Sequence, residues 1–180
     1  SAITSAASLI GLPGAGPDTI TRARSIIQRQ SQHLSHIVDD LLDLSRAMSG
    51  KILLNRQPVE MAQLMRACYE TFRATGRTLE YAVELDTNPD CWVEGDLTRL
   101  EQITSNLIDN ALKYTPAGGR IDLVTRVEGD DTVLTVRDTG VGIGPDLLPH
   151  VFDVFVQGTS SIDRAQGGLG IGLALVRRLV

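Results

Sequence analysis

The chain of 180 residues has few aromatic residues, no excess of basic residues and no long apolar run. Aromatic residues make up 4% of the sequence and the formal net charge is −5. Proteins that bind nucleic acid typically need a basic surface or aromatic stacking platforms, so we expect no nucleic-acid partner. No apolar run approaches the ~20 residues of a membrane span, and no signal peptide opens the chain. We therefore also expect no membrane segment in this chain.

Cysteine is scarce as well. Cys68 and Cys91 are far apart in sequence and form no Cys-x-x-Cys motif, which excludes the common metal and redox spacings. The pattern favours two reduced thiols in a cytosolic protein, with a disulfide as the alternative. We expect a cytoplasmic location for this portion of the protein, and the hydrophobic content of 42% is enough for a buried core.

Residues 18–50 have the apolar period of one long helix. Apolar side chains recur every three or four residues over four heptads, which is typical of a helix that packs along a partner helix. Asp18 is the expected N-cap and Gly50 the expected C′ residue. Residues 1–10 are weakly helical and 11–17 form a loop. We predict that residues 1–50 form a helical hairpin of coiled-coil or four-helix-bundle type, and that it dimerises.

Residues 51–180 mix the periods of strands and helices. We predict a helix capped by Asp96 that ends near Tyr114, before Pro116. The other predicted helices cover 59–75, 147–155 and the end of the chain from 169. The predicted strands cover 51–57, 79–85, 91–94, 120–128 and 132–138, and Gly129-Asp130-Asp131 is expected to join the last two in a hairpin. The predicted fold class is α+β: the helical hairpin at 1–50, followed by a two-layer α/β sandwich at 51–180.

Two asparagines lie one helical turn apart in the stretch Asn106-Leu-Ile-Asp-Asn-Ala-Leu-Lys-Tyr-Thr-Pro116. The i, i+4 spacing places Asn106 and Asn110 on one face of the helix. An amide oxygen is a hard ligand, suited to a Mg²⁺ ion that bridges phosphate oxygens. Lys113 could meet phosphate charge, and Tyr114 could lie against a base or sugar. Ordinary hydrogen bonds made by the two asparagines are the alternative.

Two glycine-rich blocks follow this helix. Asp138, at the end of an apolar strand, precedes Gly140, Gly142 and Gly144, and a carboxylate there can accept from the exocyclic amino group of adenine. A plain strand-ending turn is the alternative. The second block, Gly167-Gly-Leu-Gly-Ile-Gly172, opens the last helix, where backbone N–H groups can bind an anion. It is neither a P-loop nor a Rossmann turn.

In this order, the blocks at 106–116, 138–144, 152–155 and 168–172 resemble the N, G1, F and G2 boxes of the ATP-binding domain of sensor histidine kinases. That family belongs to a superfamily with gyrase, Hsp90 and MutL. Residues 18–50 resemble the second helix of the family's dimerisation and phosphotransfer domain. The resemblance implies the family's α/β sandwich, ATP and Mg²⁺ as ligand and cofactor, and a response-regulator receiver domain as partner.

The resemblance also implies roles for individual residues. Asn110 would bind Mg²⁺, Asn106 would lie near the phosphates, and Asp138 would read the adenine amino group. Phe152 and Phe155 would pack in the lid. The remaining nucleotide-binding residues implied by the resemblance are Lys113, Tyr114, Gly140, Gly142, Gly168, Gly170, Gly172 and Leu173.

Two positions bear on the reaction. Gyrase-like relatives carry a water-activating Glu where this chain has Asn106, and an amide is a poor general base near neutral pH. This favours a kinase over an ATPase. Gln157 stands where many histidine kinases carry a lid Arg, as it often does in relatives fused to receiver domains, which suggests a hybrid kinase.

None of the three histidines, His33, His36 and His150, has the acid and proline spacing of the family's phosphoacceptor. We expect the acceptor to lie upstream of Ser1, and the strands that complete the sheet in the family to follow Val180. The sequence thus predicts the kinase core of a two-component sensor histidine kinase, unable to phosphorylate itself as this chain stands. A gyrase- or Hsp90-like ATPase and a non-catalytic dimerisation and nucleotide-sensing module are the alternatives.

Overall fold

The computed structural model describes residues 2–12, 16–48, 53–157 and 169–180, without the side chains of several α2 residues, among them His33 and His36. The chain divides into two compact units, Ser1–Ser45 and Arg46–Val180. Each unit is described by itself. Within the described ranges, no helix is both long enough and apolar enough to cross a membrane.

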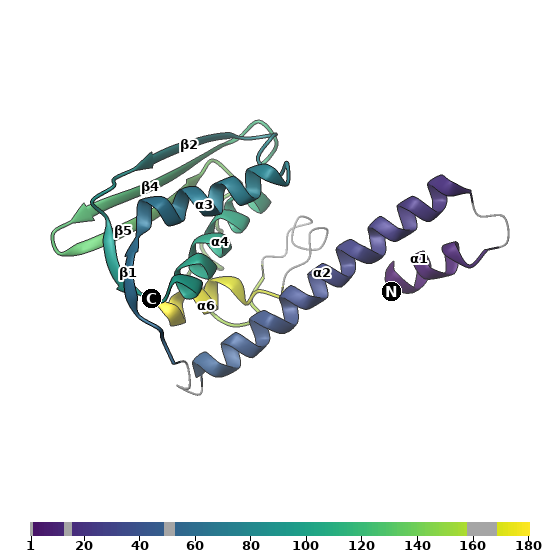
Figure 1. The fold of residues 1–180 in the computed structure, drawn as a ribbon, viewed down its shortest axis with the longest axis horizontal. Coiled ribbons are helices and arrows are strands. Elements are labelled where there is room, and N and C mark those ends of the chain that lie inside the picture. The colour runs from purple at the N-terminus through teal and green to yellow at the C-terminus, as the bar shows by residue number, and fades with distance from the viewer. Residues whose placement is uncertain (1, 13–15, 49–52, 158–168) are drawn as a thin grey trace. The chain divides into compact units, whose positions relative to one another are not determined.

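The first unit is helical. It contains α1 (Ala2–Ile10) and most of α2 (Pro17–Met48), and the chain reverses its direction between them (Figure 1). Ala6 and Ala23 are almost fully buried, whereas Leu34 and Leu42 of α2 expose half of their surface. The predicted long helix is confirmed, but Asp18 lies inside its first turn and is not the residue before it. Gly50 lies outside the described residues.

The second unit is built on two small sheets. In the larger sheet the order is β2 (Ala82–Thr87), β4 (Arg120–Glu128) and β5 (Asp131–Asp138). Strands β2 and β4 are parallel, and β4 and β5 form the predicted antiparallel hairpin around Gly129, whose φ is 64°. The smaller sheet pairs β1 (Gln57–Glu60) with β3 (Trp92–Gly95), antiparallel.

Helices cover one face of the larger sheet. They are α3 (Met61–Ala74) and α4 (Leu97–Tyr114), and α6 (Gly172–Leu179) packs on α4 (Figure 1). Ile121 and Leu123 of β4 alternate with partly buried residues and enter one core with Met65 of α3 and Ile108 of α4. Burial of each such side chain stabilises the unit by roughly 1.5–3 kcal/mol. The mixed α+β fold class is confirmed for this unit.

Several predicted boundaries were wrong. The predicted strand at 51–57 is instead β1 at 57–60, because a strand needs a partner and its partner is β3. Helix α3 begins at Met61 and not at 59 for the same reason, since Val59 and Glu60 pair with β3. The strand predicted at 79–85 begins only at Ala82.

The helix predicted at 147–155 is a single 3₁₀ turn, η1 (Leu148–His150). The Gly144 carbonyl accepts hydrogen bonds from the N–H groups of Leu147 and Leu148, and the helix is not continued. Phe155, with a φ of 66°, has left-handed backbone that a right-handed helix excludes. Other predictions are confirmed within about one residue: helix 97–114 and the strands at 91–94, 120–128 and 132–138.

Cys68 and Cys91 are both buried and both free, which confirms two separate thiols. Burial raises the pKa of the Cys68 thiol, although a hydrogen bond from Ser105 opposes the shift. The two cysteines therefore belong to the core and its packing.

Candidate functional site

Helix α4 places the two asparagines on the edge of the core. Asp96 caps the helix, with its Oδ1 accepting from the Arg99 N–H at 3.2 Å, as predicted. Asn106 and Asn110 are partly buried, and neither side-chain amide hydrogen-bonds to any residue that the structure describes. Partly buried amides normally have partners. The ordinary hydrogen bonds that were the alternative for this pair are therefore absent from the described part of the chain.

The start of α6 lies against Asn106. A Cβ added to Gly172 would lie 3.1 Å from the Asn106 Oδ1 atom, which is tighter than most real contacts. A larger residue at this position would therefore require the Asn106 amide to shift by a few tenths of an ångström. Leu173, the next residue, is partly buried. The structure thus joins the first asparagine to the second glycine block, as the predicted site requires.

The turn after Asp138 packs on the end of α4. Asp138 Oδ1 accepts from the Gly140 N–H at 2.8 Å, and the Val141 N–H donates to the Tyr114 carbonyl at 3.1 Å. A Cβ on Gly140 would lie 2.6 Å from Asp138 Oδ1 and 2.9 Å from the Tyr114 carbonyl carbon. Asp138 Oδ2 accepts no hydrogen bond from the described residues, so one carboxylate oxygen remains for a ligand.

Lys113 and Tyr114 lie together at the end of α4. The Lys113 Nζ atom lies 4.8 Å from the centre of the Tyr114 ring, in a cation–π contact. At the preceding residue, the Tyr81 hydroxyl donates to the Leu112 carbonyl at 2.9 Å and holds the end of the helix. The lysine is therefore positioned over an aromatic face beside the Asp138 turn.

Two glycines of the glycine-rich blocks have left-handed backbone. Gly142 and Gly170 have φ values of 69° and 68°, which glycine adopts easily. The Phe155 N–H donates to the Gly170 carbonyl at 3.1 Å, and a Cβ on Gly170 would clash with the Val156 backbone. Gly168 lies outside the described residues. The Arg177 Cζ atom lies 5.7 Å from the centre of the Phe152 ring. No described contact tests the predicted lid role of Phe152.

Sequence reasoning missed Thr115. Its side chain is 4% exposed and its Oγ1 atom has no partner among the described residues. The hydroxyl lies between Tyr114 and the Pro116 turn, where a bound water or a ligand group could satisfy it. Nothing in the sequence distinguishes this threonine from the others.

A metal ion at this site would depend on few protein ligands. Among the described residues, no three His, Cys, Asp or Glu side chains converge on one point. An ion bound here would therefore take an amide oxygen, water and oxygens of its ligand, which is the coordination that Mg²⁺ adopts with phosphates. The amides of Asn106 and Asn110, which have no partners among the described residues, fit this requirement.

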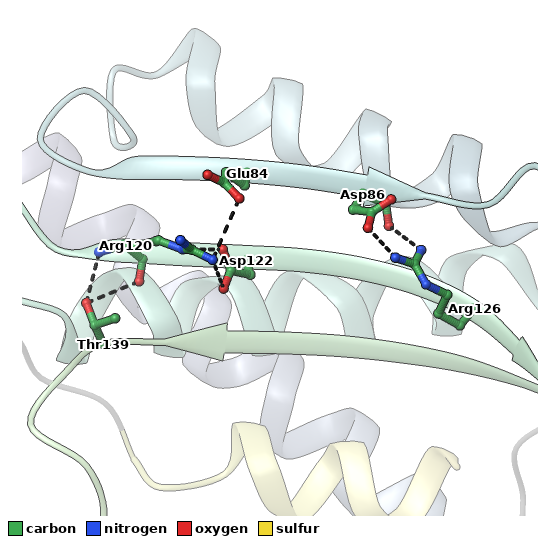
Figure 2. Close-up of polar contacts among 6 residues, drawn as sticks. All are labelled: Glu84, Asp86, Arg120, Asp122, Arg126 and Thr139. Carbon is green, nitrogen blue, oxygen red and sulfur yellow. Dashed lines mark hydrogen bonds and ion pairs between the residues drawn. The ribbon is translucent and has the colours of Figure 1, made fainter.

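The outer face of the larger sheet carries a second polar cluster, on the side away from α4. Arg120 bonds Asp122 at 2.7 Å and lies 3.7 Å from Glu84, and Arg126 pairs with Asp86 (Figure 2). Hydrogen bonding from Arg120 lowers the pKa of the Asp122 carboxyl. These charges pair with one another on the outer face of the sheet, so they form a solvated face and not part of the site on α4.

Comparison with known proteins shows the family of the chain. Residues 95–180 match the family described as histidine kinase-, DNA gyrase B-, and HSP90-like ATPase. The chain is 32% identical over 162 residues to the autoinducer 2 sensor kinase/phosphatase LuxQ of Vibrio harveyi, covering 86% of this chain and 19% of LuxQ. The chain belongs to the sensor histidine kinases. This histidine kinase chain thus spans about a fifth of the length of that relative.

Solved structures show the same fold. Full-length ShkA in complex with AMPPNP aligns with a TM-score of 0.74 and 27% identity, over 99% of this chain and 36% of ShkA. Histidine kinase ThkA in complex with the response regulator protein TrrA aligns with a TM-score of 0.71 over 100% of this chain and 50% of that one. At 23% identity, the ThkA likeness concerns the fold alone.

Proposed function

We propose that residues 95–180 bind Mg·ATP at the face of α4 that carries Asn106 and Asn110, and that they form the phosphoryl-donor half of a histidine kinase. One observation carries this proposal: α4 carries two partly buried amides without partners in the described chain, Asn106 lies against the start of α6, and the Asp138 turn packs on the end of the same helix. The match to the ATPase family and the ShkA–AMPPNP complex support the ligand.

The residues have complementary roles. Asn110 holds Mg²⁺, which supplies charge neutralisation between phosphates when bound. Lys113 leaves the Tyr114 ring to meet phosphate charge, and Tyr114 lies along the nucleotide. Asp138 offers its Oδ2 oxygen to the adenine amino group while Gly140 holds its Oδ1 oxygen. Gly142, Gly168, Gly170, Gly172 and Leu173 shape the rest of the pocket.

We propose that Asn106 has a positioning role and does not activate a water molecule. Its amide lies against Gly172, so its position couples α4 to the start of α6. An amide cannot accept a proton near neutral pH, so hydrolysis lacks a general base at this position. Transfer to a protein side chain is then favoured over the ATPase reaction of gyrase-like proteins.

The acceptor is a histidine outside the described site. His150 lacks the acid and proline spacing of the family's phosphoacceptor, and its Nδ1 atom lies 2.8 Å from Asp153 Oδ2. The side chains of His33 and His36 are not among those that the structure describes. We propose that this chain alone does not autophosphorylate, that its helical hairpin at 1–50 forms a homodimer, and that phosphate passes on to an Asp of a response-regulator receiver domain.

Calorimetric titration with Mg·ADP tests the proposal. We expect binding to the wild-type chain, and a loss of affinity of roughly tenfold or more for Asn110→Ala in Mg²⁺, because a metal ligand is removed. With EDTA in place of Mg²⁺ the difference should shrink. Asn88→Ala, in the β2–β3 loop, is the matched control and should bind as the wild type does. Absence of binding by the wild-type chain would contradict the proposal and favour a non-catalytic dimerisation module.

A further inference from the structure

Asp96 holds two distant parts of the chain with its two oxygens. Oδ1 accepts from the Arg99 N–H at 3.2 Å and caps α4. Oδ2 accepts from the Asn55 N–H at 2.9 Å, in the segment 53–56 that precedes β1. The bond from Asn55 is the main reason that the pKa of the Asp96 carboxyl is lowered, and the bond from Arg99 is the second. The charged form therefore accepts from both sides.

The surroundings of Asp96 form a packed joint. The β1–β3 pairing begins with Gln57 opposite Gly95, directly beside the two bonded residues. A Cβ on Gly95 would lie 2.7 Å from Leu100 Cδ1, so the end of β3 lies against the first turn of α4. The Leu100 N–H also donates to the Asp96 carbonyl at 2.9 Å. The start of α4 is therefore fixed to the place where β1 begins.

The position of this joint in the chain is informative. Residues 53–56 are the first described residues after α2, so a displacement of the chain that leaves α2 reaches Asn55 before it reaches β1. On the other side, Asn106 lies ten residues beyond Asp96 on the same helix, or about 15 Å along its axis. One carboxylate thus stands between the incoming chain and the helix of the candidate site.

We propose that Asp96 is a positioning residue that couples the segment after α2 to helix α4. While the Asn55 N–H donates to Oδ2, the Asp96 carboxylate keeps its capping geometry. When that hydrogen bond breaks, the cap of α4 loosens. The regulatory meaning of this coupling rests on the proposed function, because α4 carries the amides assigned to Mg·ATP. A cap and a strand end that merely share one residue would show no such coupling.

The test uses Asn55→Pro, which removes the donor without changing Asp96. Asn55→Ala keeps the backbone N–H and is the matched control. Amide hydrogen exchange, measured by NMR on the whole chain, should show the Arg99 and Leu100 amides exchanging roughly three- to tenfold faster in Asn55→Pro than in Asn55→Ala, in line with the loss of one hydrogen bond. Amides of β4 should not change, which verifies the fold. Equal Arg99 exchange in the two variants would overturn the proposal.

Asp96→Asn provides a second test should proline disturb the fold. Asparagine is a good N-cap but has a single side-chain oxygen. The Asn55 amide should exchange roughly tenfold faster than in the wild type, while the Arg99 amide changes much less. If the Asn55 amide keeps its wild-type rate in this variant, Asp96 does not hold the segment and the proposal is wrong.

The link to the proposed function has its own measurement. Mg·ADP should bind Asn55→Pro about threefold more weakly than Asn55→Ala, because the nucleotide helix is less well held. Equal Mg·ADP affinity in the two variants would show that the contacts of Asp96 do not affect nucleotide binding. It would overturn the regulatory role of Asp96. If no variant binds Mg·ADP, the proposed function fails, and the exchange rates still decide whether Asp96 couples the two segments.

Discussion

Helices α2 and α4 have the same apolar period but bury it to different extents. In α4 the side chains of Ile108, Ala111 and Leu112 are at most 5% exposed. In α2 the side chains of Leu34 and Leu42 are each 50% exposed. The difference lies in the neighbours: α4 lies between a sheet and two other helices, whereas much of the apolar stripe of α2 has no cover from the described residues. A periodic pattern therefore predicts the face that will be buried and leaves its partner undetermined.

The elements that pack on α4 also determine where its polar side chains lie. Once one face of α4 is fixed in the core, Asn106 lies against Gly172 and the end of the helix lies against the Asp138 turn. Apolar side chains that the described residues leave exposed, such as Leu34 and Leu42, can instead serve association. We attribute ligand binding to α4 and dimerisation to α2 on this basis.

The largest expected effect is on the core of α4. Ile108→Ala should lower the free energy of unfolding by about 3 kcal/mol, because it removes buried methyl groups and leaves a cavity. Leu42→Ala, on the exposed stripe of α2, should change it by less than about 0.5 kcal/mol at concentrations where the chain is monomeric. Urea unfolding of both variants measures the contrast. Similar losses for the two would show that the α2 stripe is buried in solution.

The second prediction concerns the stripe of α2. The double variant Leu34→Lys/Leu41→Lys should weaken self-association by about a hundredfold, because charges replace apolar contacts at the proposed dimer interface. Sedimentation equilibrium measures this, with Leu53→Lys, at a residue that is 96% exposed, as the matched control. A wild-type chain that remains monomeric at all concentrations would contradict the dimer.

The third prediction compares how the two helices begin. Asp96→Ala removes a cap and should cost about 1 kcal/mol of stability. Asp18→Ala removes a residue within the first turn of α2 and should cost less. Thermal unfolding of the two variants at neutral pH measures the difference.

The contribution of Asp96 should depend on pH. Because its pKa is lowered in the folded protein, the stabilisation is present above the usual pKa of about 3.9 and is lost as the pH falls through the lowered value. The midpoints of Asp96→Ala and the wild type should therefore differ at pH 7 and converge in strong acid. A difference that grows as the pH falls would contradict this sign.

The smallest effect is expected on the outer face of the sheet. Asp86→Ala removes the partner of Arg126, but both side chains are exposed and solvent screens their pairing (Figure 2). The unfolding midpoint should change less than it does for Asp96→Ala, and high salt should reduce the change further. A loss as large as that of Ile108→Ala would show that this face is covered in solution.

The elements that sequence predicted well are those whose signals are local. The cap of Asp96, the period of α4 and the Gly129 turn of the hairpin each depend on nearby residues, and each is confirmed. The boundaries of β1 and of the 147–155 segment were wrong because they depend on distant partners. β1 forms where β3 offers hydrogen bonds, and Phe155 leaves helical geometry where Gly170 accepts its N–H.

The candidate site divides in the same way. The sequence by itself determined the residue types, their i, i+4 spacing on one helix and the absence of a general base at Asn106. Only the tertiary structure placed Gly172 against Asn106, left both amides without partners in the described chain and joined Asp96 to Asn55. The physical reason is range: helical period and capping act over a few residues. The site, by contrast, needs segments far apart in the chain to meet, and the shared core brings them together.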